Sequence, residues 1–197
     1  MKQQTKKIAR YSALALTAAA VLPMACKKDA ENDDPNIVHR DLNVSITSTT
    51  TTPSVIDSID INLDGVYDLG VAVYSSATGT AAIAAGLHDR LSIYCDTAIA
   101  TGSIRFIFGA DAGFTAPSPY TLPLNWKSLG VLDIQGATKT GGIGGKGDKY
   151  FSFVFRNGLK VFHGWTKVNI STDRKTLVLK DLAYSVLPDT PIKTGAK

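Results

Sequence analysis

A short run of alternating residues limits the fold of this chain more strongly than any other feature. Phe151, Phe153 and Phe155 are separated by single smaller residues. An apolar side chain at every second position places one face of a β-strand in a hydrophobic core, whereas an amphipathic helix repeats every 3.6 residues or so. Asn157-Gly158 follows directly and predicts a type I′ turn, because Asn and Gly tolerate positive φ angles. This part of the chain therefore predicts a β-hairpin.

The strand expected after this turn, over residues 159–170, carries apolar residues on both faces. Phe162 and Val168 fall on one face, and Val161 and Trp165 fall on the other. A strand that buries both faces lies inside a structure rather than at its edge. We therefore expect a central position for this strand.

Further strands are predicted by short apolar runs that end in turn residues. They lie at residues 69–74, 91–95, 104–108 and 131–134. The apolar phase changes near Lys180-Asp181, which predicts a β-bulge. The alanine-rich residues 80–87 fit either a helical turn or a strand, and the sequence leaves this open. We expect an all-β fold, an antiparallel, jelly-roll-like β-sandwich with long loops, as a single domain over residues 41–197.

Residues 1–25 have the three-part organisation of a secretory signal peptide. Lys2, Lys6, Lys7 and Arg10 form a positive region, and an apolar run over residues 13–22 follows. This run is too short for a membrane-spanning helix, which needs about 20 apolar residues. Removal of the segment takes away four of the 21 basic residues and leaves as many basic as acidic residues. The mature chain therefore does not predict a nucleic-acid-binding surface.

The sequence around Cys26 resembles the lipobox of bacterial lipoproteins. The small residue Ala25 precedes the cysteine, although Pro23 stands where the family usually has leucine. The resemblance implies that the chain is cut before Cys26 and that acyl chains such as palmitate are attached there. Two or three acyl chains anchor a small domain stably in a membrane. The alternative is an ordinary signal peptide that is cleaved near Ala25 and leaves Cys26 unmodified.

Residues 26–40 are expected to form a flexible tether. The charged, acidic stretch after Cys26 resembles the export signal of Bacteroidetes-type surface lipoproteins, which implies an outer-membrane protein exposed at the cell surface. The same composition also fits a solvated spacer without a surface role. Further along, residues 43–46 are expected to begin an edge strand, and the threonine-rich residues that follow either extend this strand or form a stalk.

Residues 60–68 match the first nine positions of a calcium-binding loop. Alternating oxygen-bearing side chains point at one centre, Gly65 allows the tight bend, and the Val66 carbonyl adds a ligand. Val71 stands where an EF-hand has its bidentate glutamate, so the loop resembles those of secreted bacterial β-proteins instead. The predicted ligands of this structural calcium are Asp60, Asn62, Asp64, Val66 and Asp68. An Asp-Gly hairpin turn is the alternative.

The cysteines and histidines give no sign of a catalytic centre. If Cys26 is lipidated, Cys95 is a single thiol on a predicted strand and is expected to be a small buried residue. The three histidines have no metal-ligand spacing to one another in sequence. A Gly-x-Gly-x-x-Gly pattern at residues 142–147 runs into a strand rather than a helix, which argues against a dinucleotide site.

Two further kinds of functional residue are predicted. Trp126 and Trp165 are candidates for stacking against a ligand, although a place in the core is the ordinary role of such residues. Ser58 and Thr97 each follow an aspartate and precede an apolar residue. This pattern resembles the O-glycosylation sites of Bacteroidetes periplasmic proteins.

The last third of the chain resembles the ending of secreted bacterial β-sandwich proteins, most of which lack an assigned activity. We therefore expect a membrane-anchored surface lipoprotein that is not an enzyme and that binds a glycan or a surface protein. One alternative is a carbohydrate-active hydrolase that uses a pair of carboxylates. A second alternative is a structural subunit of an envelope assembly.

Overall fold

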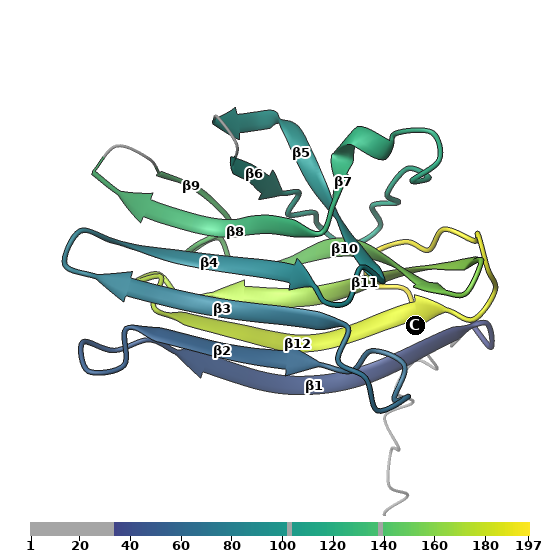
Figure 1. The fold of residues 1–197 in the computed structure, drawn as a ribbon, viewed down its shortest axis with the longest axis horizontal. Coiled ribbons are helices and arrows are strands. Elements are labelled where there is room, and N and C mark those ends of the chain that lie inside the picture. The colour runs from purple at the N-terminus through teal and green to yellow at the C-terminus, as the bar shows by residue number, and fades with distance from the viewer. Residues whose placement is uncertain (1–33, 102–103, 138–139) are drawn as a thin grey trace, which may run out of the picture. The chain divides into compact units, whose positions relative to one another are not determined.

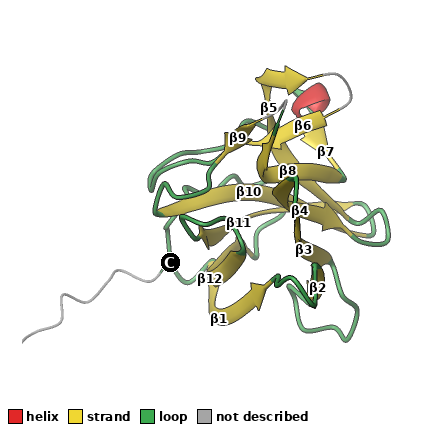
Figure 2. Ribbon diagram, turned by 90° about the vertical axis from the view of Figure 1, so that its left-hand side faces the viewer, coloured by secondary structure: helices red, strands yellow, loops and turns green. Residues whose placement is uncertain are grey.

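The computed structural model describes residues 34–101, 104–137 and 140–197, without the side chains of residues 97–104. The predicted signal peptide, Cys26 and most of the predicted tether lie outside these ranges. The described chain is built of strands and loops, with one 3-10 helix, η1, at Pro123–Asn125 (Figure 2). The strands are β1 (Ile37–Thr47), β2 (Ser54–Ile59), β3 (Leu69–Ser76), β4 (Gly79–Gly86), β5 (Leu91–Thr101), β6 (Ile104–Ile107), β7 (Trp126–Lys127), β8 (Leu129–Gly136), β9 (Thr140–Gly142), β10 (Asp148–Asn157), β11 (Lys160–Ile170) and β12 (Thr176–Ser185).

The expected all-β fold is confirmed. The alanine-rich segment that fitted either a helix or a strand is strand β4, and the strand that follows the proposed edge strand, β2, was not expected. Within the described ranges, no helix is long and apolar enough to cross a membrane.

The strands are arranged in the order β1-β12-β11-β10-β5-β6-β8-β4-β3-β2 (Figure 1). We call β1, β12, β11, β10, β7 and the first part of β5 sheet A, and β2, β3, β4, β8, β9 and β6 sheet B. Strand β5 joins the two sheets because it pairs with β10 in one and with β6 in the other. The pairs are antiparallel except for the contact of β6 with β8, where Phe106 lies beside Val131 in parallel.

The main hydrophobic core lies between the two sheets. The alternating phenylalanines of β10 supply its centre, since Phe151 and Phe153 are fully buried and Phe155 is 4% exposed. Sheet B contributes Leu69, Val71 and other small apolar residues from the inner faces of β3 and β4. The period-two pattern of the sequence therefore predicted the core face of β10 correctly.

Strand β11 is buried on both faces and lies between β10 and β12, as the sequence predicted. Phe162 and Val168 face the main core, while Val161 belongs to a second apolar cluster on the outer side of sheet A. Two segments cover this outer side. The first is residues 108–122, which a bridge from Ala110 to Tyr150 holds in place. The second is the end of the chain, where the Ala196 carbonyl bonds to Trp165.

The β-bulge expected near Lys180-Asp181 is confirmed. Lys167 of β11 pairs with Asp181, and the next residue, Val168, pairs with Leu179. Lys180 is therefore the extra residue of the bulge. Strand β1 is also irregular here, between Asp41 and Val44. The two neighbours of β12, which are β1 and β11, thus both change their register at Lys180.

Two local expectations need correction. The β10–β11 turn has Gly158 and Leu159 as its central residues, because Asn157 pairs with Lys160. Only Gly158 has a positive φ angle, of 61°, which is the pattern of a type II′ turn rather than type I′. Strand β1 begins at Ile37, inside the stretch expected to be tether, because its first residues pair with the end of β12.

Candidate functional site

The predicted stacking residues Trp126 and Trp165 are both buried, which corrects their assignment as a ligand platform. Trp165 is 0% exposed, and its indole N–H donates a hydrogen bond to the carbonyl oxygen of Ala196 at 3.2 Å. Trp126 is 8% exposed and packs against Tyr94, with 5.3 Å between the ring centroids. Both rings therefore pack beneath the segments that cover the outer side of sheet A, where a ligand does not reach them.

A tyrosine on sheet B is exposed to solvent, as a ligand-stacking residue must be, whereas the two tryptophans are buried. Tyr74 lies near the end of β3, and its side chain is 47% exposed. Its neighbours Val73 and Ser75 are buried, so Tyr74 points to the outer side of the sheet. The sequence carries this signal, because Tyr74 is out of phase with the apolar residues of its strand and precedes a run of small hydroxyl residues. Sequence reasoning alone missed this residue.

Two cavities meet at Tyr74. The larger, of about 510 Å³, is lined by Thr50, Pro53, Ser76 and Lys175 among others, and the smaller, of about 200 Å³, lies toward β4 and β8. Tyr74 and Ser76 line both. The smaller cavity is lined further by Thr78, Gly79, Thr80, Ala81, Ile134, Gln135 and Gly136. An aromatic ring with a few hydroxyl and amide groups beside it combines the two kinds of group that ligand sites use, apolar area and polar groups that fix orientation.

One hydroxyl of strand β4, on the inner side of sheet B, has no hydrogen-bond partner among the residues that the structure describes. The Oγ1 atom of Thr80 is buried and makes no hydrogen bond, although Thr80 lines the smaller cavity. A buried hydroxyl without a partner loses the hydrogen bonds that it makes to water in the unfolded chain. Thr80 pairs with the buried Ser75, so its side chain leaves the inner face of the sheet and not the outer face that carries Tyr74.

The cross-strand rows of sheet B that contain and adjoin Tyr74 carry no charged side chain. Because side chains alternate between the faces of a strand, the outer residues of β2, β3, β4 and β8 follow from their pairing. Ile56 is 73% exposed on this surface and Leu129 is 55% exposed. We call this surface the open face; its three cross-strand rows are Ser54, Tyr74, Ala81 and Ile134; Ile56, Ala72, Ile83 and Val131; and Ser58, Gly70, Ala85 and Leu129.

The predicted calcium loop joins β2 to β3. It spans the nine residues between Ile59 and Leu69, which are themselves paired, so it is longer than a two-residue Asp-Gly hairpin. The Asp60 carboxylate accepts hydrogen bonds from the backbone N–H groups of Gly65 at 2.8 Å and of Asp64 at 3.3 Å. Gly65 has a φ angle of 87°, as the bend requires. The oxygen-bearing side chains at the start of this loop are thus drawn together on its inner side.

Asp68 lies apart from the other acids of the loop. It is 2% exposed, and its Oδ2 accepts a hydrogen bond from the Ile61 backbone N–H at 2.9 Å. Burial, above all, raises the pKa of this carboxyl, while the Ile61 N–H opposes the shift. The carboxylates of Asp60, Asp64 and Asp68 do not all come within 4.8 Å of one another. The loop is therefore ordered by its own hydrogen bonds, and its three carboxylates are not gathered around one point.

The remaining predicted residues are placed as follows. Ser58 is half-buried on β2, and its backbone N–H bonds to the Asp57 carboxylate at 2.7 Å. Thr97 lies within β5, but its side chain is outside the described atoms, as is Cys26. Cys95 is 1% exposed, which confirms the expected role as a small buried residue, and burial raises the pKa of its thiol to about 11. Glycosylation of Ser58 and Thr97 and lipidation of Cys26 stay predictions.

No protein-family model, curated protein or solved structure matches this chain. The inference of function therefore depends on the surface of sheet B, the loop between β2 and β3, and the sequence around Cys26.

Proposed function

We propose that this protein is a lipoprotein of the outer membrane, exposed at the cell surface, that binds a glycan through Tyr74 without acting as an enzyme. The observation that carries the proposal is the position of Tyr74, half-exposed between two cavities with hydroxyl and amide linings. The C–H face of a sugar ring buries apolar area against an aromatic ring. The sugar hydroxyls then bond to the groups on either side.

The larger cavity also suggests which sugars fit best. Lys175 lines this cavity together with Tyr74. The open face on which Tyr74 lies has no charged side chain of its own. An ammonium group at the rim of an otherwise neutral site attracts a carboxylate. We therefore expect sugars that carry a carboxylate, such as uronic acids, to bind more tightly than neutral sugars.

The test is a glycan array probed with the purified protein, followed by titration calorimetry with the best ligand. Tyr74→Ala should abolish measurable binding, and Lys175→Gln should weaken it for acidic sugars alone. Tyr120→Ala is the matched control, since Tyr120 is 64% exposed but lies in a distant loop. Binding that survives in Tyr74→Ala, or an array without any ligand, would contradict the proposed function.

The anchor is proposed from the lipobox-like sequence. Acyl chains on Cys26 would hold the chain at the membrane, with the residues up to β1 as the tether. Cys26→Ser in the full chain should move the protein from the membrane fraction to the soluble fraction. A variant that remains in the membrane fraction would show that the thiol is not the point of attachment.

We also propose that the β2–β3 loop binds a structural calcium ion. Its ligands would be Asp60, Asn62, Asp64 and the Val66 carbonyl, with Asp68 buried beneath them. Oxygen ligands at alternating positions are what calcium prefers. Support comes from the bonds of Asp60 to Gly65 and Asp64, which pre-order the loop.

Calcium added to the metal-free protein should raise its unfolding temperature. At a calcium concentration one hundred times Kd, the expected gain is about 2.7 kcal/mol. Asp60→Asn should remove the response, whereas the exposed Asp89→Asn should retain it. A midpoint that does not move with calcium would mean that the loop is ordered by its hydrogen bonds alone.

A second candidate, a hydrolase with paired carboxylates, has one observation in its favour. Ligand atoms of Asp41 and Asp181 lie within 4.8 Å of each other. Asp181, however, is 8% exposed and bonded to His39, whereas both carboxylates of a glycosidase flank the sugar. We therefore place the binding function first, and release of reducing sugar from the array ligands would reverse this order.

A further inference from the structure

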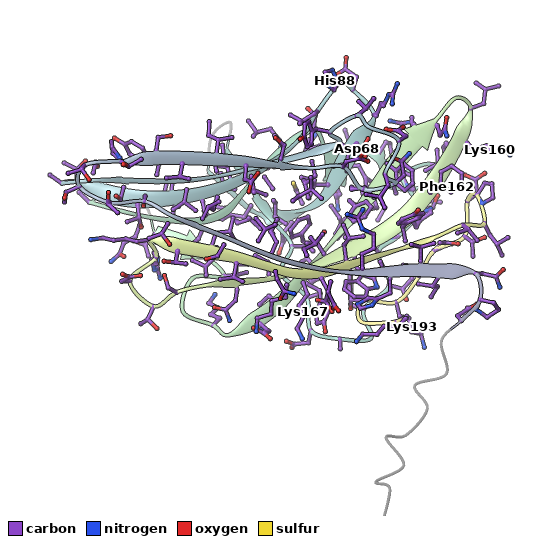
Figure 3. The ribbon with its side chains drawn as sticks, turned by 90° about the horizontal axis from the view of Figure 1, so that it is seen from below. Asp68, His88, Lys160, Phe162, Lys167 and Lys193 are labelled. Carbon is purple, nitrogen blue, oxygen red and sulfur yellow. The ribbon has the colours of Figure 1, made fainter. Side chains whose placement is uncertain are left out.

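A cluster of metal-ligating side chains lies on the outer side of sheet A, on the face of β1 opposite Arg40, whose guanidinium bonds to the Asp60 and Ile61 carbonyls of the β2–β3 loop. It consists of His39 and Asp41 on β1 and Asp181 on β12. Asp41 and Asp181 are direct cross-strand partners, and His39 is two residues from Asp41, so all three side chains leave the same face. Figure 3 shows the neighbouring Lys167 on the side of the ribbon opposite Asp68.

The three side chains are close enough to share one ion. One nitrogen or oxygen atom from each lies within 4.8 Å of the other two. His39 Nε2 is 3.1 Å from Asp181 Oδ2. The ligand atoms of a tetrahedral zinc ion are about 3.4 Å apart, as follows from metal–ligand distances near 2.1 Å. Small side-chain rotations would bring the cluster to this spacing.

A second observation points to a missing partner. Asp181 is 8% exposed, and its Oδ1 atom is buried without any hydrogen bond. A buried carboxylate oxygen in this state is costly, because burial removes water and nothing replaces it. The register irregularity in β1 and the bulge at Lys180 occur beside these residues. Such bulges redirect side chains next to functional sites.

The nearby lysines do not supply this partner. Lys167 is the cross-strand neighbour of Asp181 on β11, yet its Nζ lies 3.5 Å from Asp148 Oδ2. Lys180 also pairs with Asp148, at 2.8 Å. Asp148 therefore forms the ion pairs with both ammonium groups. Lys167 still places a positive charge near Asp181, but the side chain that bonds to the Asp181 carboxylate is His39.

We propose that His39, Asp41 and Asp181 bind a divalent transition-metal ion, of which Zn²⁺ is the best fit. One imidazole and two carboxylates neutralise its charge, and imidazole nitrogen favours zinc over calcium. Asp41 is exposed, so a fourth position faces solvent and takes water. The ion ties the edge strand β1 to β12 where the ladder between them is interrupted.

The experiment is calorimetric titration of the protein, purified without a polyhistidine tag, with Zn²⁺ alone. One ion should bind per chain. His39→Asn and Asp41→Asn should each weaken the affinity by about tenfold or more. Asp41 is exposed, so its variant should fold even if replacement of the buried Asp181 does not. His88→Asn and Asp89→Asn are the matched controls, because both positions are exposed and have φ angles of 55°, which Asn tolerates.

Trp165 gives an independent readout of where the ion binds. Its ring centroid is 5.9 Å from that of His39, so a quenching ion such as Cu²⁺ should reduce its fluorescence. The measurement uses Trp126→Phe, which leaves Trp165 as the fluorophore, and Zn²⁺ should compete with the quenching. The proposal is overturned if Zn²⁺ does not bind, or if His39→Asn and Asp41→Asn bind it as tightly as the two controls.

Discussion

The outer faces of the two sheets have opposite characters. The outer face of sheet A is covered by the 108–122 segment and the end of the chain, and it carries charged side chains in pairs and clusters. The open face of sheet B is uncovered and uncharged. A covered face needs its charges neutralised by partners, whereas an uncovered face without charges is free to meet a ligand. The difference shows that residues packed or paired beneath other segments lie on one side of the molecule, and that the other side is the one open to the proposed ligand.

The largest expected effect is the loss of a tryptophan from the covered face. Trp165→Ala should lower the free energy of unfolding by about 3–5 kcal/mol, because the side chain is fully buried and its removal leaves a cavity. Urea unfolding followed by circular dichroism measures the change. A loss below about 1 kcal/mol would mean that the covering segments pack only loosely on sheet A.

A second test concerns the charge that sheet B keeps on its inner side. Asp133 is 1% exposed, accepts a hydrogen bond from the Gly144 N–H at 2.7 Å and lies 3.3 Å from Arg174. Asp133→Ala should cost about 3 kcal/mol of unfolding free energy, because it leaves a buried donor and a guanidinium without their partner. The control is Asp111→Ala, which breaks an exposed pair with Lys149 and should cost less than about 1 kcal/mol.

Packing on the covered face should also make the stability of the protein depend on pH. Burial lowers the pKa of His163, which is 4% exposed on the covered face beside Trp126. The unfolded chain therefore binds a proton at this position more readily, and stability falls as the pH drops below about 6.5. Burial raises the pKa of Asp68 and Asp133, which act in the opposite direction at lower pH.

Unfolding measured in urea at pH 7.5 and pH 5.5 isolates the histidine. We expect the loss of stability between these values to be smaller in His163→Gln than in the unchanged protein. Equal losses in the two proteins would show that His163 keeps its proton equilibrium on folding.

The smallest expected effect on stability is on the open face. Tyr74→Ala should change the free energy of unfolding by no more than about 0.5 kcal/mol, because the side chain is half-exposed and away from the core. The same variant should lose glycan binding. A large loss of stability would instead make Tyr74 a packing residue, and the contrast between the two faces would fail.

The sequence predicted the fold where local periodicity carries the information. The phase of Phe151, Phe153 and Phe155, the position of β11 and the bulge at Lys180 all follow from alternation within one strand. The extra strand β2 was missed because its Asp57 and Ser58 interrupt the apolar pattern. Such strands form only when a neighbour, here β3, supplies their hydrogen bonds.

The sites were harder to predict because they depend on what covers a face. Trp165 is a stacking candidate because of its residue type, and neither its type nor its position in the alternating pattern reveals the segment that covers it. His39 and Asp181 are 142 residues apart in sequence, so their contact follows from the pairing of β1 with β12 rather than from spacing. Tyr74 was detectable from phase, but its cavities were not.

The pairing of the first strand with the last has a consequence for engineering. The backbone N–H of Asp34 bonds to the carbonyl oxygen of Lys197 at 2.8 Å, so these two positions are adjacent in space. A short linker would join them without strain, and the chain could be opened instead at Leu159, whose side chain is fully exposed in the β10–β11 turn. Ile37 and Gly164 pair with the last two residues of β12, so the starts of β1 and β11 lie at the same end of sheet A. A lipid attached to the new first residue of such a circular permutant would therefore hold the domain by the same end as a lipid ahead of β1.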